Sequence, residues 1–154
     1  AWLRAMDPQL RIQAVDPAFE RVRIADALAG PNGLVKQGSS PDLPDFQGQP
    51  DLVLMLDMAH YLSDDQLRKT LLHLNKKMRP GARLILRTTV PSAAAPPLYR
   101  RVETIKLRLA GRPAYYRFVD HMKELLAQGG FVIEQAQASG QGREEYWFIG
   151  RPGK

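Results

Sequence analysis

The stretch that most restricts the possible folds of this chain runs from residue 51 to residue 91. It opens with Asp51–Leu56, a nearly unbroken apolar run that is typical of a strand buried on both faces of a parallel sheet. A segment with helical periodicity follows, and Arg83–Val90 is a second β-rich run, which ends at Pro91. Strand, helix and strand joined by short connections predict a right-handed βαβ crossover with its helix packed on the sheet.

The helix of this crossover carries its own start and stop signals. Ser63 and Gln66 have the spacing of a capping box. Apolar residues then recur along one helical face, at Leu67, Leu71, Leu74 and Met78. Arg79-Pro80-Gly81 ends the helix and turns the chain.

The rest of the chain repeats the alternation of strands and helices. Further strands are predicted at Leu10–Val15, Gly33–Gln37, Phe131–Ala136 and Glu145–Ile149. Further helices are predicted up to Leu28, from Leu98 onward, and over Arg117–Gln128. The pattern predicts one α/β domain with a Rossmann-like, doubly wound and mostly parallel sheet, closed by a C-terminal antiparallel hairpin.

Composition excludes several classes of function. The 154 residues suit a single domain, and the absence of cysteine excludes disulfides, thiol nucleophiles and cysteine zinc sites. No HExxH or GxSxG motif is present, and no metal site is expected. The net charge of +6 favours anionic partners or simply a solvated basic surface. No nucleic-acid partner and no membrane span are expected, and nothing in the sequence indicates secretion, so we expect a cytoplasmic protein.

Four short motifs resemble those of class I S-adenosylmethionine-dependent methyltransferases, in the order of that family. They are Asp51-Leu52-Val53-Leu54, Ala59-His60-Tyr61-Leu62, Arg79-Pro80-Gly81-Ala82 and Leu84-Ile85-Leu86. The third departs from the family pattern, because Ala82 stands where a second glycine is usual. Each motif alone is common, whereas the ordered set is fairly specific and the resemblance extends over nearly the whole chain. It implies S-adenosylmethionine as the cofactor.

Asp16 is the strongest candidate for a cofactor contact. An acid at the carboxyl end of the strand Leu10–Val15 can accept hydrogen bonds from both hydroxyls of a ribose. The resemblance implies that Asp16, with the adjoining Pro17, holds the ribose of S-adenosylmethionine. The alternative is an aspartate that caps the helix beginning at Pro17. Nicotinamide cofactors use an acid at the same place, so Asp16 by itself does not separate the two cofactors.

The resemblance places further cofactor contacts at the ends of two other strands. Gly38 and Ser39 follow Gly33–Gln37, where the family has a small polar or acidic residue near the adenine. Asp42 is an alternative partner if its loop folds back, and an ordinary polar loop is the other interpretation. Leu56 and Asp57 lie at the carboxyl end of the strand Asp51–Leu56, where the backbone in the family meets the methionine part of the cofactor. Asp57 is equally compatible with a solvated loop acid.

His60 and Tyr61 are the candidate catalytic residues, because they follow directly after this strand end. A neutral imidazole can take a proton from a hydroxyl or amine acceptor while the methyl group arrives. The alternative is a histidine that only packs and forms hydrogen bonds in the loop. His73 and His121 are interpreted as structural or surface residues.

The Gly-rich cofactor turn of the family has no counterpart here, and Gly30-Pro31-Asn32-Gly33 follows a helix, which is wrong for that role. We therefore expect residues 1–154 to be an N-terminally incomplete domain, the C-terminal portion of a longer methyltransferase without its first strand. Either an upstream segment fills the place of that strand, or two chains exchange strands, or Leu10–Val15 pairs directly with Asp51–Leu56. The expected function is methyl transfer to a small-molecule or carrier-bound acceptor, with a homodimer as a possible assembly. A non-catalytic accessory domain and an NAD-dependent oxidoreductase are the alternatives.

Overall fold

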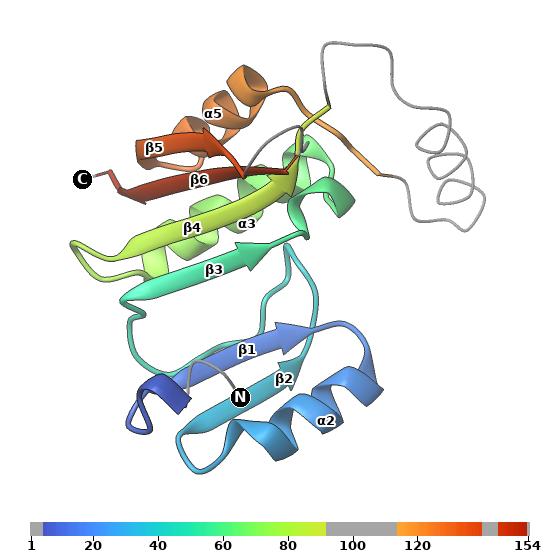
Figure 1. Ribbon diagram of the computed structural model, residues 1–154, viewed down its shortest axis with the longest axis vertical. Helices are drawn as coiled ribbons and strands as arrows, with labels where there is room; N and C mark the ends of the chain where they lie inside the picture. Colours follow the sequence, from blue (N-terminus) through green and yellow to red (C-terminus); the bar gives the residue numbers. More distant parts are fainter. Residues whose placement is uncertain (1–4, 92–113, 140–144, 154) are drawn as a thin grey trace. The chain divides into compact units, whose positions relative to one another are not determined.

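The computed structural model describes residues 5–91, 114–139 and 145–153 (Figure 1). The chain divides into two compact units, residues 1–48 and residues 49–154. The helix predicted from Leu98 onward lies outside the described residues. Among the described residues, no helix is both long enough and apolar enough to cross a membrane.

The first unit contains two strands and one helix. β1 (Ile12–Asp16) and β2 (Gly33–Gln37) run parallel, with Asp16 opposite Gln37, and α2 (Phe19–Ala29) connects them. The helix lies close to β2, since a Cβ atom on Gly33 would come within 2.3 Å of the Cβ atom of Ala29. The sequence predicted the bounds of β2 correctly and placed β1 slightly too early.

No described residue of the first unit is buried. The helical periodicity of this segment predicts that Phe19 and either Leu28 or Ala29 face a core, but Phe19 and Leu28 are 61% and 62% exposed. That prediction is wrong for the described residues, because one helix on two strands leaves the apolar positions without a second layer. Parallel strands are normally covered on both faces, so this unit by itself is poorly buried for its fold class.

The second unit is built on a mixed four-stranded sheet in the order β3-β4-β6-β5. Its elements are β3 (Leu52–Leu56), the short 3₁₀ helix η1 (Ala59–Tyr61), α3 (Asp64–Lys77), β4 (Arg83–Thr89), α5 (Val119–Gln128), β5 (Phe131–Ala138) and β6 (Glu145–Pro152). β3 and β4 are parallel, and β6 is antiparallel to both β4 and β5. The predicted C-terminal antiparallel pair is therefore present, in a sheet that contains both parallel and antiparallel pairs.

The core of the second unit lies between this sheet and the helices α3 and α5, which cover the same face (Figure 1). Leu67 and Leu71 are fully buried on α3, as their spacing predicts. Strand and helix residues complete the core, among them Leu84, Leu86, Met122, Leu126 and Phe148. Helical periodicity over Arg117–Gln128 predicts that Phe118 faces the core, but this prediction is wrong, because the residue precedes α5 and is 60% exposed.

Both ends of α3 follow from its sequence. The Ser63 hydroxyl accepts from the Gln66 N–H at 3.3 Å, and the Gln66 side chain accepts from the Ser63 N–H at 2.9 Å. The predicted capping box is confirmed. After the helix, Gly81 has a φ of +81°, a conformation that residues with a Cβ atom rarely adopt.

β3 is buried on one side only. Met55 faces the helices and is 3% exposed, whereas Leu52, Leu54 and Leu56 are 42–47% exposed. The prediction of a strand buried on both faces is therefore wrong for the described residues. Exposed and covered residues alternate along β3, as in a strand with a single covered face. The sequence of β3 is apolar throughout and does not show this alternation, which comes from the tertiary packing.

Candidate functional site

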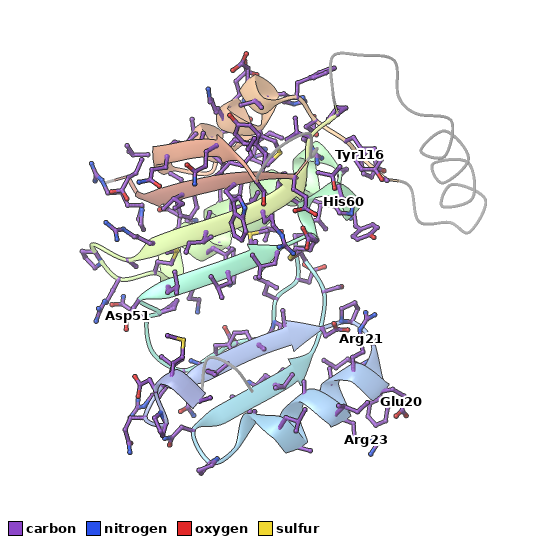
Figure 2. All side chains as sticks on the ribbon, viewed as in Figure 1. Glu20, Arg21, Arg23, Asp51, His60 and Tyr116 are labelled. Atoms are coloured by element: carbon purple, nitrogen blue, oxygen red, sulfur yellow. The ribbon has the colours of Figure 1, made fainter. Side chains whose placement is uncertain are left out.

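Asp16 ends β1 and makes local contacts. Its Oδ1 atom accepts from the backbone N–H of Ala18 at 2.7 Å and from Nε of Arg21 at 2.9 Å, and its Oδ2 atom accepts from the same Nε at 3.0 Å. The side chain is 34% exposed, while that of Arg21 is 67% exposed. Figure 2 labels Arg21 on α2, together with its neighbours Glu20 and Arg23. Ala18 is the N-cap residue of α2, which has no side-chain cap hydrogen bond, so this contact of Asp16 lies just before the helix and is not an N-cap bond.

These contacts decide the charge of Asp16. Partial burial opposes ionisation, but the Ala18 N–H and the Arg21 guanidinium outweigh it and hold the pKa of Asp16 below its ordinary value. The carboxylate is therefore ionised at neutral pH. An ionised carboxylate is the form that accepts hydrogen bonds from two hydroxyls.

Gly38 lies beside Asp16 at the carboxyl edge of the two parallel strands. Its N–H donates to the backbone oxygen of Asp16 at 3.2 Å. A Cβ atom at this position would meet Cδ of Pro44 at 2.8 Å and Cγ2 of Val15 at 3.1 Å, so packing requires a glycine here. Ser39, Asp42 and Pro17 are exposed at the same end of the unit.

Asp57 follows β3 and is engaged by Arg87 of β4. Nε of Arg87 donates to Oδ1 of Asp57 at 2.9 Å, and Nη2 donates to Oδ2, which makes a two-point ion pair. The hydrogen bonds to Asp57 raise the pKa of Arg87 above its ordinary value, although burial opposes this. The Arg87 guanidinium also lies over the Trp147 ring at 5.2 Å from the ring centroid.

The backbone at Asp57 turns sharply, with a φ of +55°, a conformation that only a few per cent of residues other than glycine adopt. Its N–H donates to the backbone oxygen of Arg87 at 2.9 Å, so both the main chain and the side chain of Asp57 are held by β4. Leu56, the preceding residue, is 44% exposed. A contact from Leu56 or Asp57 to the methionine part of a cofactor stays a prediction.

His60 and Tyr61 lie in the 3₁₀ turn η1, just beyond the carboxyl end of β3. Figure 2 labels His60 together with Tyr116. His60 is 8% exposed, and Tyr61 is 51% exposed. The His60 ring lies 4.2 Å from the Tyr61 ring and is stacked on the Tyr116 ring at 5.7 Å, between ring centroids. The turn therefore presents one buried imidazole among aromatic rings, with an exposed phenol beside it.

The segment Tyr115–Arg117 contacts this turn, which the sequence analysis did not anticipate. Arg117 is 4% exposed, and its guanidinium donates to the backbone oxygens of Ala59 at 3.0 Å and Leu62 at 2.5 Å. No local sequence pattern indicates these contacts, because they join residues more than fifty positions apart. An arginine directly before an apolar helix face was the only available signal.

The structure thus groups the predicted residues into two sets. Asp16, Gly38 and Ser39 lie at the strand ends of the first unit, and Leu56, Asp57, His60 and Tyr61 lie at the end of β3 in the second unit. Their assembly into one site stays a prediction. No cluster of three or more histidine or acidic side chains suited to a metal ion occurs among the described residues. The side chains at these strand ends include two carboxylates, an imidazole and a phenol.

Comparison with known proteins rests on structure, since no family model and no curated protein matches the sequence. The apo form of SibL, an S-adenosylmethionine-dependent methyltransferase, matches with a TM-score of 0.76 and 19% identity, over 99% of this chain and 46% of that protein. LaPhzM matches with a TM-score of 0.72 and 21% identity, over 98% of this chain and 45% of that protein. Human N-acetylserotonin methyltransferase in complex with SAM matches with a TM-score of 0.69 and 18% identity, over 98% of this chain and 43% of that protein.

This chain has the fold found in S-adenosylmethionine-dependent methyltransferases, and it spans less than half the length of the solved proteins that it matches. The resemblance read from the four sequence motifs is borne out at the level of fold.

Proposed function

We propose that this chain is part of a methyltransferase that uses S-adenosylmethionine. One observation carries the proposal: structures with TM-scores of 0.69–0.75 over 97–98% of this chain include LepI and human N-acetylserotonin methyltransferase in complex with SAM, and CalO1 in its SAH-bound form. A fold can serve several activities, so the residues must also fit the cofactor.

Asp16 fits the ribose if Arg21 gives way. The carboxylate has about four positions at which it can accept hydrogen bonds, and its present contacts leave room chiefly at Oδ2. Accepting two ribose hydroxyls would displace Nε of Arg21. Because that ion pair is largely exposed, its loss costs little, on the order of 0–1 kcal/mol. Gly38 and Ser39 beside it would contact the adenine, and Leu56 and Asp57 the methionine part.

S-adenosylmethionine supplies an electron-poor methyl group that is transferred by in-line displacement. The protein would contribute mostly orientation, because holding the reacting groups in line removes most of the entropic cost. His60 in its neutral form would take the proton of the acceptor hydroxyl or amine, and the exposed Tyr61 ring beside it would orient the acceptor.

The acceptor we propose is a small molecule or a group bound to an acyl carrier protein. We also propose a doubly wound sheet that contains an upstream first strand. The same proposal includes a cytoplasmic location and a possible homodimer.

Calorimetry with S-adenosylhomocysteine and with NAD tests the cofactor assignment directly. We expect binding of S-adenosylhomocysteine only, and incubation with S-adenosylmethionine carrying a labelled methyl group should label an acceptor. Binding of NAD instead would support the oxidoreductase, and binding of neither would support an accessory domain.

A second candidate function is cofactor binding without methyl transfer. It is favoured by the match to a pericyclic reaction enzyme, with a TM-score of 0.75 and 14% identity over 98% of this chain. In that case S-adenosylhomocysteine and S-adenosylmethionine would both bind. The product would form without the labelled methyl group, and the cofactor would be recovered unchanged.

A further inference from the structure

Three backbone oxygens of the turn that carries His60 accept hydrogen bonds from one distant segment. Nη1 of Arg117 donates to the oxygen of Ala59 at 3.0 Å, the Tyr115 N–H donates to the oxygen of His60 at 2.6 Å, and Nη2 of Arg117 donates to the oxygen of Leu62 at 2.5 Å. These acceptors span the whole turn. Within the turn itself, the Tyr61 N–H donates to the Met58 oxygen at 3.0 Å and the Leu62 N–H donates to the Ala59 oxygen at 3.3 Å.

The Arg117 guanidinium is held in place from two further sides. Its Nε atom donates to Oδ1 of Asp64 at 2.7 Å, and Nη1 also donates to the oxygen of Tyr115 at 3.0 Å. Asp64 begins α3, and its Oδ2 atom lies 3.1 Å from Nε2 of His121 on α5. Arginine suits this position because its planar fork presents five donors in fixed directions.

Burial makes these contacts strong determinants of geometry. Arg117 is 4% exposed, and a buried charge without its partners carries a large desolvation penalty. The guanidinium therefore favours the one arrangement of the turn in which the oxygens of Ala59 and Leu62 both point at it. The Tyr116 ring, which lies between the two residues that donate, stacks on the His60 ring at 5.7 Å between centroids.

We propose that Arg117 is a positioning residue for His60, acting through the turn 59–62. This inference rests on the proposed function, in which His60 takes the proton of the methyl acceptor. Arg117 itself touches the backbone of the turn and the carboxylate of Asp64, and it acts on the chemistry only through the placement of the imidazole.

The test compares Arg117→Met and Arg117→Lys in the full-length protein. Methionine keeps much of the length and removes all donors, whereas lysine keeps the charge as a single point that cannot bridge both oxygens and Asp64. Arg68→Met is the matched control. Arg68 pairs with Asp65 at 2.7 Å on the surface of α3, and its side chain is 40% exposed. If Arg117→Met does not fold, Arg117→Lys by itself provides the comparison with the unaltered protein.

The first measurement is amide hydrogen exchange at Tyr61, Leu62 and Tyr115. We expect exchange at least about 10-fold faster in Arg117→Met, which corresponds to the loss of a single hydrogen bond to a charged group, and an intermediate increase in Arg117→Lys. Arg68→Met should exchange like the unaltered protein. Unchanged exchange in both Arg117 variants would overturn the proposal, whatever the activity.

The second measurement separates positioning from simple loss of structure. We expect kcat to fall about 10- to 100-fold in Arg117→Met, the cost of a misplaced reacting group, with unchanged affinity for S-adenosylhomocysteine. Arg117→Lys should recover part of kcat. A loosened turn with unaltered kcat would overturn the positioning role. A protein that loosens as expected but binds no S-adenosylhomocysteine would refute the proposed function and leave the effect of Arg117 on the turn established.

Discussion

Both carboxylates expected to hold the cofactor are already paired with arginines. Asp16 is bound by Arg21 and Asp57 by Arg87. The two pairs differ in exposure, because Arg21 is 67% exposed and Arg87 is 30% exposed. Asp16 can therefore exchange its partner for a ligand at low cost, whereas Asp57 is held by a two-point contact and by the backbone of β4.

The substitution Asp16→Ala tests whether Asp16 binds the cofactor. We expect affinity for S-adenosylhomocysteine to fall by about 1.5–3 kcal/mol, the range for hydrogen bonds to a charged group, as measured by calorimetry. Glu20→Gln is the control, since this exposed acid of the neighbouring helix pairs only with Arg23 in the contacts described and should leave affinity unchanged. Equal affinity in the alanine variant and the unaltered protein would remove Asp16 from the site.

Arg21→Met should raise the pKa of Asp16 toward its ordinary value of 3.8. Because the folded pKa lies below that value, the ion pair stabilises the fold at pH above about 3.8, and this stabilisation is lost as the pH falls through the lowered pKa. A carbon-detected NMR titration of the Asp16 carboxyl group measures the shift. Arg23→Met, on the same helix, should leave the pKa of Asp16 unchanged. An equal effect of both variants would mean that the net charge of the protein, and not the contact with Arg21, sets the pKa of Asp16.

At the scale of elements, α3 is the best-determined part of the chain. Its first turn holds Asp64 and Asp65 and its last turn Lys76 and Lys77, which matches the polarity of the helix dipole. Its apolar stripe fills the core, and its capping box satisfies two N–H groups that a helix start leaves unpaired. Every local signal in this element agrees with its tertiary position.

Ser63→Ala should therefore lower the free energy of unfolding by about 1 kcal/mol, within the usual 0.5–2 kcal/mol for a lost N-cap. Urea unfolding followed by circular dichroism measures the change. Ser39→Ala is the matched control, because Ser39 is an exposed loop serine and should leave stability within about 0.5 kcal/mol. A Ser63 variant as stable as the control would mean that packing alone fixes the start of α3.

At the scale of the whole molecule, burial is concentrated in the second unit. Every residue classed as buried in the described chain belongs to it, from Met55 to Gly150, and residues 5–48 contribute none. In the described residues β1 pairs only with β2, and β3 pairs only with β4. Pairing of Leu10–Val15 with Asp51–Leu56, one of three arrangements considered from the sequence, stays a prediction.

This distribution predicts unequal stability along the chain. Backbone amides of β1 and β2 should exchange at least about 10-fold faster than those of β4 and α3, because regions with little apolar burial open with less free energy. Hydrogen exchange followed by mass spectrometry resolves the two units. Similar protection in both would show that the first unit is covered by chain or by a partner beyond the described residues.

Elements whose signals are local could be recognised from the amino-acid sequence. The βαβ order of residues 51–90, the capping box and stripe of α3, and the antiparallel pair at the C-terminus could all be predicted, since each depends on periodicity or on caps within a few residues. The candidate residues Asp16 and His60 were found in the same way, from their positions at predicted strand ends, and their roles stay predictions.

Packing between segments determines which apolar residues are covered and which distant side chains meet. Leu54 and Met55 are equally apolar neighbours, yet one is 42% and the other 3% exposed, because the helices cover one face of the sheet. Arg117 reads as one more basic residue before a helix, yet it is buried against the turn that carries His60. Burial and contact between segments depend on packing across the chain, which no short window of sequence contains.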